Sequence, residues 1–331
     1  MKIRDRDSIG TLIDHFADQA LAAYNEPLQF SALPVQKDAN YIVCGMGGSS
    51  FVIDVLRDML LDGLHIYTSR TYSLPREANE KSLVCISSYS GNTEEALSCY
   101  KEALKRKMRV FATGAGGKLE ALAKRDGVPF LKISAPGVTQ PRYSSGFQLG
   151  YQLRVLEAHG LIQSHKKVLE ETAREALKFR FQKQGLALAK KLFKRIPVLY
   201  VDVAYYSVAR VGTIKIMENS KTLAHWNVLP EMNHNEMNGF YFSKRQGKFS
   251  AVFLETTDSH PRILKRMKIV QRLAKEKGLN VHRVVLPGRT HFSRMIAGIE
   301  FMDWTSYYLA QLNGIDPSPV DMVEDFKKML G

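Results

Sequence analysis

Short apolar runs alternate with longer amphipathic segments along most of this 331-residue chain, and this alternation limits the possible folds more than any other feature. The apolar runs have the length and β-branched content of buried strands, whereas the segments between them have a helical period. Such alternation is typical of βα units around a parallel sheet. Five strands are expected in the first half, at 41–45, 64–69, 82–90, 109–114 and 130–134.

The second half repeats this plan after a long charged segment at 164–195, which is predicted to be one helix. Each half also closes in the same way, because a strand ends in a Pro/Gly turn, passes a loop with arginine or histidine, and enters a helix. We therefore predict an α/β protein with two doubly wound parallel-sheet subdomains related by pseudo-duplication, at 1–160 and 161–331. Strands of the second half are expected at 196–202, 225–230, 249–256 and 280–287.

Charge narrows the class of ligand. The 47 Lys and Arg residues exceed the 33 Asp and Glu residues, and the formal net charge of +14 favours anions. The basic residues are spread over amphipathic helices, which is typical of solvated helix faces, so nucleic acid is not expected as a partner.

Neither a membrane nor a secretory pathway is indicated by the sequence. No window reaches the roughly 18 apolar residues of a membrane span, and the N-terminal segment mixes both charge signs without an apolar stretch. Cys44, Cys85 and Cys99 form no CxxC pair and lie in apolar runs, so they are expected to be reduced core residues. We expect a cytoplasmic protein with no membrane partner.

A glycine-rich loop, Gly45–Ser50, follows the first strand and opens a helix. Gly47 and Gly48 would let the backbone approach a ligand closely, and free helix amides would bind an anion. A dinucleotide is disfavoured because the third glycine of GxGxxG is displaced and no acidic residue closes the next strand. The alternative is a tight turn that binds nothing.

A hydroxyl-rich loop, Ser87–Thr93, follows the third strand and precedes its helix. Ser88, Ser90 and Thr93, with the helix amides, would offer neutral donors to a phosphate dianion. Thr93 could instead act only as a helix N-cap. Because ligands of open α/β sheets bind at the carboxyl ends of the strands, two such loops together predict a phosphate site.

Together, the strings GMGGSS (45–50) and SSYSGNTEEAL (87–97) resemble the sugar isomerase (SIS) domain, whose serine and threonine loop binds a phosphosugar. Four later strings narrow the resemblance to the bifunctional phosphoglucose/phosphomannose isomerases, over nearly the whole chain. These are MENSK (217–221), LPEMNHNE (229–236), HFSRM (291–295) and DPSPV (316–320). The resemblance implies two SIS subdomains, matching the predicted pseudo-duplication.

The resemblance also implies catalytic roles. Glu218 resembles the base that moves a proton between C1 and C2, and Arg142 resembles the cation that stabilises the enediolate. His234 resembles the ring-opening histidine, which the family supplies from the other subunit of a homodimer. The alternatives are a helix-end glutamate, a surface arginine and a turn histidine. A metal site at Glu231, His234 and Glu236 is disfavoured because helical HExxH spacing is absent.

The remaining implied residues contact the phosphosugar. Lys327 aligns with an active-site lysine near the family's C-terminus, although Lys328 is adjacent and a solvated lysine is the alternative. His291 is assigned no role beyond capping or positioning a helix. The other expected contacts are Gly47, Gly48, Ser49, Ser88, Ser90 and Thr93.

The resulting hypothesis is reversible isomerisation of fructose 6-phosphate to glucose 6-phosphate, and to mannose 6-phosphate, through a cis-enediol and without a metal or organic cofactor. One alternative is another phosphosugar isomerase of the SIS fold, such as a hexulose or sedoheptulose phosphate isomerase, although those domains are typically shorter. The other is a non-catalytic phosphosugar sensor, which would need a reader module that the sequence does not show.

Overall fold

The apolar runs form two parallel sheets, each within its own compact unit. The computed structural model describes residues 9–60, 63–135, 138, 140–242 and 247–330. The N-terminal unit is His15–Arg174, and the C-terminal unit is Glu175–Gly331 together with the segment that ends at Asp14. The units therefore divide between Arg174 and Glu175, whereas the sequence places the division after residue 160.

The N-terminal unit has a five-stranded sheet of order β2-β1-β3-β4-β5, in which all pairs are parallel. Alternate residues of β1, Ile42 and Cys44, share a core with α4 and α5, because successive side chains of a strand point to opposite faces. Its strands are β1 (Tyr41–Cys44), β2 (Ile66–Ser69), β3 (Leu83–Ser87), β4 (Arg109–Gly114) and β5 (Phe130–Lys132). Its helices are α2 (Phe16–Asn25), α3 (Gly48–Met59), α4 (Glu94–Lys105), α5 (Gly117–Asp126), η1 (Pro141–Tyr143), α6 (Ser145–Ala158) and α7 (Lys166–Ala176).

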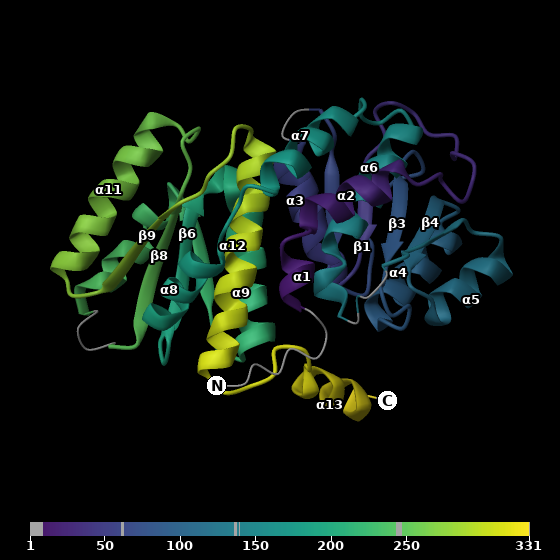
Figure 1. Cartoon of the computed structure of the whole chain (residues 1–331). Coiled ribbons are helices and arrows are strands. Elements are labelled where there is room, and N and C mark those ends of the chain that lie inside the picture. The colour runs from purple at the N-terminus through teal and green to yellow at the C-terminus, as the bar shows by residue number, and fades with distance from the viewer. Residues whose placement is uncertain (1–8, 61–62, 136–137, 139, 243–246, 331) are drawn as a thin grey trace. The chain divides into compact units, whose positions relative to one another are not determined.

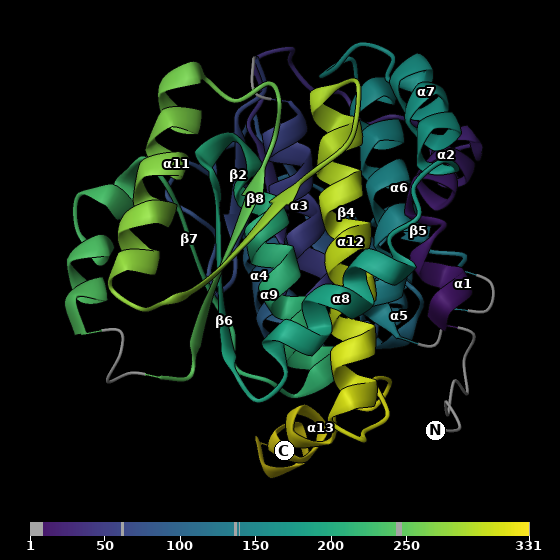
Figure 2. The same ribbon diagram turned by 60° about the vertical axis from the view of Figure 1, so that its left-hand side comes forward.

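The C-terminal unit has a four-stranded parallel sheet of order β7-β6-β8-β9. Figures 1 and 2 show the long helix α12, in yellow, beside α9 and α8, whereas α11 covers the opposite face of the sheet. The strands are β6 (Ile196–Asp202), β7 (His225–Leu229), β8 (Phe249–Glu255) and β9 (Asn280–Val285). The helices are α1 (Ile9–Ile13), α8 (Gln182–Leu192), η2 (Val203–Tyr205), α9 (Tyr206–Ser220), η3 (Glu231–Asn233), η4 (Glu236–Phe242), α11 (Pro261–Glu276), α12 (His291–Leu312) and α13 (Asp321–Leu330).

The two sheets share one plan, which confirms the predicted fold class. The order β7-β6-β8-β9 reproduces β2-β1-β3-β4 strand for strand. In each unit the helix after the central strand packs on a later helix, α3 on α6 and α9 on α12. Equivalent strand ends in the two units can therefore be compared directly.

The prediction of one helix at 164–195 is wrong, because this segment forms two helices, α7 and α8. Phe181, between them, is 5% exposed and packs edge-on against Phe301 of α12, with 5.7 Å between ring centroids. Burying this ring stabilises the turn more than continuing an exposed, charged helix would. A long-range contact thus interrupts a locally favourable helical pattern.

Burial also settles the state of the three cysteines. Cys44, Cys85 and Cys99 are free and buried, as the sequence predicts. Burial raises the pKa of the Cys85 thiol to about 12, so it remains protonated at neutral pH.

In the part of the chain that the structure describes, no helix combines the length and apolarity needed to cross a bilayer.

Candidate functional site

The two polar loops of the N-terminal unit meet at the carboxyl ends of β1 and β3. These strands are parallel neighbours, with Cys44 paired to Ile86, so the loops that follow emerge side by side. The Tyr89 amide donates a hydrogen bond to Ser49 Oγ at 3.0 Å. Ser87 Oγ also donates to the Ser49 carbonyl at 3.3 Å. The glycine-rich and hydroxyl-rich loops thus form one connected surface.

Close backbone approach is possible in the first loop because of its glycines. Gly47 lies at φ +48°, a left-handed conformation that favours glycine, and nothing within 4 Å fills the space where its Cβ would stand. A Cβ on Gly48 would lie 3.4 Å from the Arg142 amide nitrogen. The loop therefore leaves open space at Gly47 and packs against the Arg142 backbone at Gly48.

The second loop presents hydroxyl groups at the N-terminus of α4. Ser88 Oγ donates to Thr93 Oγ1 at 2.9 Å, and the Thr93 amide donates to Ser88 Oγ at 3.4 Å. The Asn92 amide donates to Ser90 Oγ at 3.3 Å, and Ser90 is exposed. No acidic side chain lies between Ser88 and Thr93, so the loop itself offers neutral donors to an anion, while Glu94 and Glu95 stand in the first turn of α4.

Arg142 lies beside these loops in η1, which links β5 to α6. Its side chain is 2% exposed, its Nη1 donates to Gln140 Oε1 at 3.2 Å, and its guanidinium lies 5.2 Å from the centre of the Tyr143 ring. A buried arginine with this setting is not one of the many solvated arginines of the surface. The structure therefore excludes the surface alternative for this residue.

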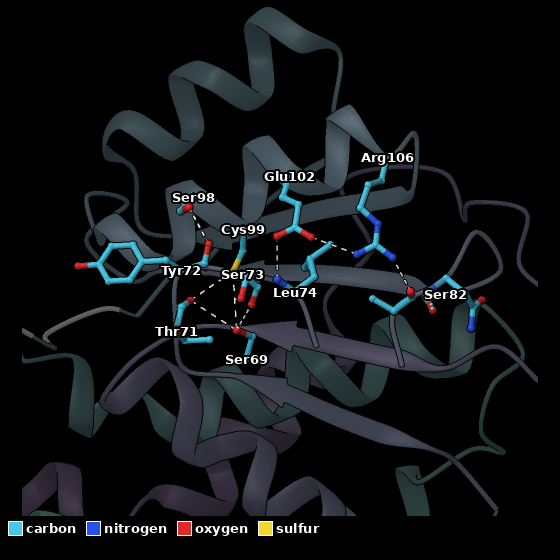
Figure 3. Close-up of polar contacts among 12 residues, drawn as sticks. Ser69, Thr71, Tyr72, Ser73, Leu74, Ser82, Ser98, Cys99, Glu102 and Arg106 are labelled. Carbon is cyan, nitrogen blue, oxygen red and sulfur yellow. Dashed lines mark hydrogen bonds and ion pairs between the residues drawn. The ribbon is translucent and has the colours of Figure 1, made fainter. Parts of the chain in front are cut away.

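A set of contacts fixes α4, and with it the hydroxyl loop at its N-terminus (Figure 3). The contacts join one side of α4 to the turn that follows β2. Ser98 Oγ donates to the Tyr72 carbonyl at 2.7 Å, Cys99 Sγ donates to the Thr71 carbonyl at 3.4 Å, and a Glu102 oxygen accepts from the Leu74 amide at 2.9 Å. Sequence reasoning missed these positioning residues because each contact joins residues 26 or 28 positions apart, and such a contact leaves no local signal.

Glu218 and His234 belong to the C-terminal unit. Glu218 is half-buried near the end of α9, just before β7, and its carbonyl accepts from Lys221 Nζ at 2.8 Å. His234 is exposed and follows the other end of β7, where its amide donates to the Glu231 carbonyl at 2.9 Å. Five strand residues, roughly 16 Å, separate the two ends of β7. Within one chain, this unit does not bring the two residues together.

The acidic neighbours of His234 are engaged in other contacts. Glu236 accepts from Tyr200 Oη at 2.6 Å and from Asn227 Nδ2 at 2.5 Å, and Glu231 accepts from Asn235 Nδ2 at 2.8 Å. Among the described residues, no group of three or more His, Cys, Asp or Glu side chains is arranged to hold a metal ion.

Lys327 lies on α13, a helix with no buried residue. Its Nζ pairs with Glu324 at 2.7 Å, and Lys328 pairs with Asp325 at 3.1 Å, so both lysines make the same kind of exposed contact one turn back. The geometry of this helix does not distinguish one lysine from the other.

The sequence of this chain is similar to one protein family and to several individual proteins. Residues 181–330 match the family described as bacterial phospho-glucose isomerase C-terminal SIS domain. The chain is 34% identical over 302 residues to a bifunctional phosphoglucose/phosphomannose isomerase of Caldicellulosiruptor bescii, covering 87% of this chain and 88% of the relative. It is 32% identical over 292 residues to the protein of the same name from Aquifex aeolicus, covering 87% and 89%.

The fold also has solved counterparts. The C-terminal domain of glucosamine-fructose-6-phosphate aminotransferase from Francisella tularensis superimposes with a TM-score of 0.68 at 12% identity, covering 96% of this chain and 99% of that domain. This likeness concerns the fold alone.

Proposed function

Because the chain belongs to the bifunctional phosphoglucose/phosphomannose isomerase family, we propose that it interconverts fructose 6-phosphate with glucose 6-phosphate and with mannose 6-phosphate. The observation that carries this proposal is the hydrogen bond from the Tyr89 amide to Ser49 Oγ, which joins two polar loops at the carboxyl ends of β1 and β3. In an open α/β sheet, ligands bind at this edge.

The phosphate group binds to the N-terminal subdomain, 1–160. Hydroxyls and amides at the N-terminus of α4 donate to its oxygens, and Gly47 and Gly48 admit it close to the backbone. Remote binding of the phosphate holds the reacting end of the sugar in place, which lowers the entropic cost of the proton transfer. The proposed contacts are Gly47, Gly48, Ser49, Ser88, Ser90 and Thr93, with Lys327 from the C-terminal helix.

The proton chemistry requires three further residues. His234 exchanges a proton with the ring oxygen as the sugar opens, and Glu218, from the subdomain at 161–331, removes a proton from C2 or C1 and returns it to the other carbon. Arg142 stabilises the enediolate oxygen that forms between the two steps. The two aldose phosphates differ only at C2 and share one cis-enediol, so one carboxylate can serve both. This scheme uses no metal and no organic cofactor.

We further propose a homodimer in which His234 serves the site of the partner subunit. In one chain, Glu218 comes before β7 and His234 after it, at opposite ends of the strand, which supports a contribution of His234 to another copy. Three buried free cysteines suit a reducing compartment, and we place the protein in the cytoplasm, with the phosphosugar and a second copy as its partners.

A coupled assay tests the activity. Purified protein is treated with EDTA and given glucose 6-phosphate or mannose 6-phosphate, while the formation of fructose 6-phosphate is followed. Activity on both is expected. Activity on only one would limit the proposal to a single-substrate isomerase, and phosphosugar binding without turnover would favour the sensor alternative.

Substitution of Glu218 tests the mechanism. Glu218→Gln keeps the shape of the side chain but removes the base, so kcat should fall about 10²–10⁴-fold while phosphosugar binding, measured by calorimetry, is retained. Glu231→Gln, an exposed residue next to His234, is the matched control and should leave kcat unchanged. Loss of binding in Glu218→Gln would indicate a structural role instead.

A further inference from the structure

The carboxyl ends of the strands in the C-terminal unit carry a second polar cluster, to which the proposed reaction assigns no role. In the shared strand order, β6 corresponds to β1 and β8 to β3. The link from β6 to α9 therefore corresponds to the glycine-rich loop, and Thr256–His260, between β8 and α11, corresponds to the hydroxyl-rich loop.

The two hydroxyl loops share one contact. Thr256 Oγ1 and Ser259 Oγ lie 2.9 Å apart directly after β8, and Ser88 Oγ lies at the same distance from Thr93 Oγ1 directly after β3. Each pair precedes the first turn of the following helix. The second unit thus also places two hydroxyls in contact at the equivalent strand end, although its pair is three residues apart in sequence and that of the first unit is five.

An acidic residue distinguishes the second loop. Tyr205 Oη, from the link after β6, donates to both carboxylate oxygens of Asp258, at 2.7 and 2.8 Å. Arg294 Nη1, from the first turn of α12, lies 3.0 Å from Asp258 Oδ2, and His291 Nδ1 lies 3.5 Å from the same atom. Two segments, the link after β6 and the first turn of α12, thus bring three side chains to one carboxylate, as they would to a bound oxyanion.

This environment holds the carboxylate in its charged form. Partial burial alone would raise the pKa of Asp258, but the hydrogen bond from Tyr205 and the charge of Arg294 outweigh burial and lower it below its usual value. The surrounding groups therefore favour a negative charge at this position.

The cluster also holds more polar atoms than one carboxylate engages. Arg294 is 9% exposed, and its Nε is buried without a hydrogen-bond partner among the described residues. His291 Nε2 is likewise buried and unpartnered within the part of the chain that is described. Since Asp258 keeps 31% of its side-chain surface exposed, a dissolved anion can reach this position.

We propose that Tyr205, His291 and Arg294 form a second oxyanion site, suited to inorganic phosphate or a phosphate monoester, and that Asp258 occupies it in place of a ligand. Because Asp258 occupies this second site, each chain binds one phosphosugar rather than two. The proposal rests on the geometry of the C-terminal unit alone and stands whether or not the chain isomerises sugars.

Removal of the carboxylate tests the proposal. Asp258→Ala is made in a chain that also carries Ser88→Ala and Thr93→Ala, so that the N-terminal loops do not contribute phosphate binding. Inorganic phosphate is the probe, with sodium chloride of equal ionic strength as the control. At phosphate concentrations about 100 times the Kd, the Tm of the Asp258→Ala chain should rise by about 5 °C, whereas the chain that retains Asp258 should not respond.

A further substitution shows where the phosphate binds. Adding Arg294→Gln to the Asp258→Ala chain should abolish the response to phosphate, because the charged donor is lost. A folded Asp258→Ala chain with no response beyond that to chloride would overturn the proposal, as would an equal response in the chain that retains Asp258.

A folding defect would not prevent the test. If the Asp258→Ala chain folds only in phosphate, the proposal is supported, since the anion then replaces the missing carboxylate. If it does not fold in either buffer, Asp258→Ser, which keeps an acceptor for Tyr205, is measured in its place, and the same two outcomes decide.

Discussion

The two strand-end clusters of this molecule have one plan and opposite chemistry. In the N-terminal unit, Ser88 and Thr93 lie in a loop without an acidic side chain. In the C-terminal unit, a matching pair, Thr256 and Ser259, flanks Asp258, whose carboxylate is already bound by the surrounding donors. The comparison teaches that equivalent strand ends of a duplicated fold can differ in charge, because the second loop carries an acidic side chain that the surrounding donors already bind.

The units also differ in how they bury charge. Lys215 of α9 and Asp303 of α12 pair at 2.9 Å with side chains 1% and 4% exposed. In the N-terminal unit, Arg70 pairs with the buried Asp54 at 2.7 Å but keeps 29% of its side-chain surface exposed. The C-terminal unit therefore depends more on a charge pair that water cannot replace.

Removing both hydroxyls from one loop at a time should give the largest difference in kcat/KM between the two strand-end clusters. Ser88→Ala with Thr93→Ala should lower kcat/KM for fructose 6-phosphate about 10²-fold or more, since each hydrogen bond to a charged group contributes about 1.5–3 kcal/mol. Thr256→Ala with Ser259→Ala is the matched control and should leave kcat/KM unchanged. Equal losses in both double variants would remove the proposed functional distinction between the units.

Breaking the buried ion pair should mainly affect stability. Lys215→Met leaves Asp303 charged and buried, so the free energy of unfolding, measured in urea, should fall by about 3–5 kcal/mol. Adding Asp303→Leu should recover most of this loss. Arg70→Ala should cost less, about 1–2 kcal/mol, because water reaches that pair. A larger loss from Arg70→Ala would reverse the order inferred from burial.

Substitution of a lysine in the C-terminal helix α13 should have a smaller effect on kcat/KM, and the adjacent lysine provides a control. If Lys327 contacts the phosphosugar, Lys327→Ala should lower kcat/KM about tenfold, the value of one hydrogen bond to a charged group. Lys328→Ala removes an equivalent exposed ion pair and should leave kcat/KM unchanged. The reverse result would assign the role to Lys328, and no change in either variant would leave both as solvated lysines.

Acid should affect the Asp258 cluster. Its pKa is lowered on folding, so the folded chain binds fewer protons than the unfolded chain and loses this contribution as pH falls below the unfolded value of about 3.9. The stability difference between wild type and Asp258→Asn, measured from urea midpoints, should therefore be full at pH 7 and shrink below about pH 4. A difference that stays constant with pH would show that the carboxylate charge is not responsible.

Most of the fold could be predicted from local pattern. The nine strands of the described residues, the two polar loops and the doubled plan all leave marks within short windows, because strand burial and turn chemistry act over a few residues. The break between α7 and α8 left no such mark, since it depends on Phe181 packing against a residue 120 positions away, Phe301. The contacts between α4 and the turn after β2 could not be predicted for the same reason.

The candidate site also has features that the sequence predicted and features that it did not. The glycines and hydroxyls of the two loops were predicted as an anion site, because residue type and spacing alone indicate donors at a helix N-terminus. The burial of Arg142 was not evident, since it depends on tertiary packing that leaves the residue 2% exposed. His291 was assigned no role, because its contact with Asp258 joins two loops that are far apart in sequence.

By itself, the sequence determined that this chain forms two parallel α/β units and that the first has a glycine-rich and a hydroxyl-rich loop, because periodicity, glycine placement and hydroxyl content are local properties. Only the tertiary structure decided that Tyr205, His291 and Arg294 meet at Asp258 in the second unit, and that Glu218 and His234 lie at opposite ends of one strand. The physical reason is that charge pairing and burial depend on which distant segments the sheet order brings together.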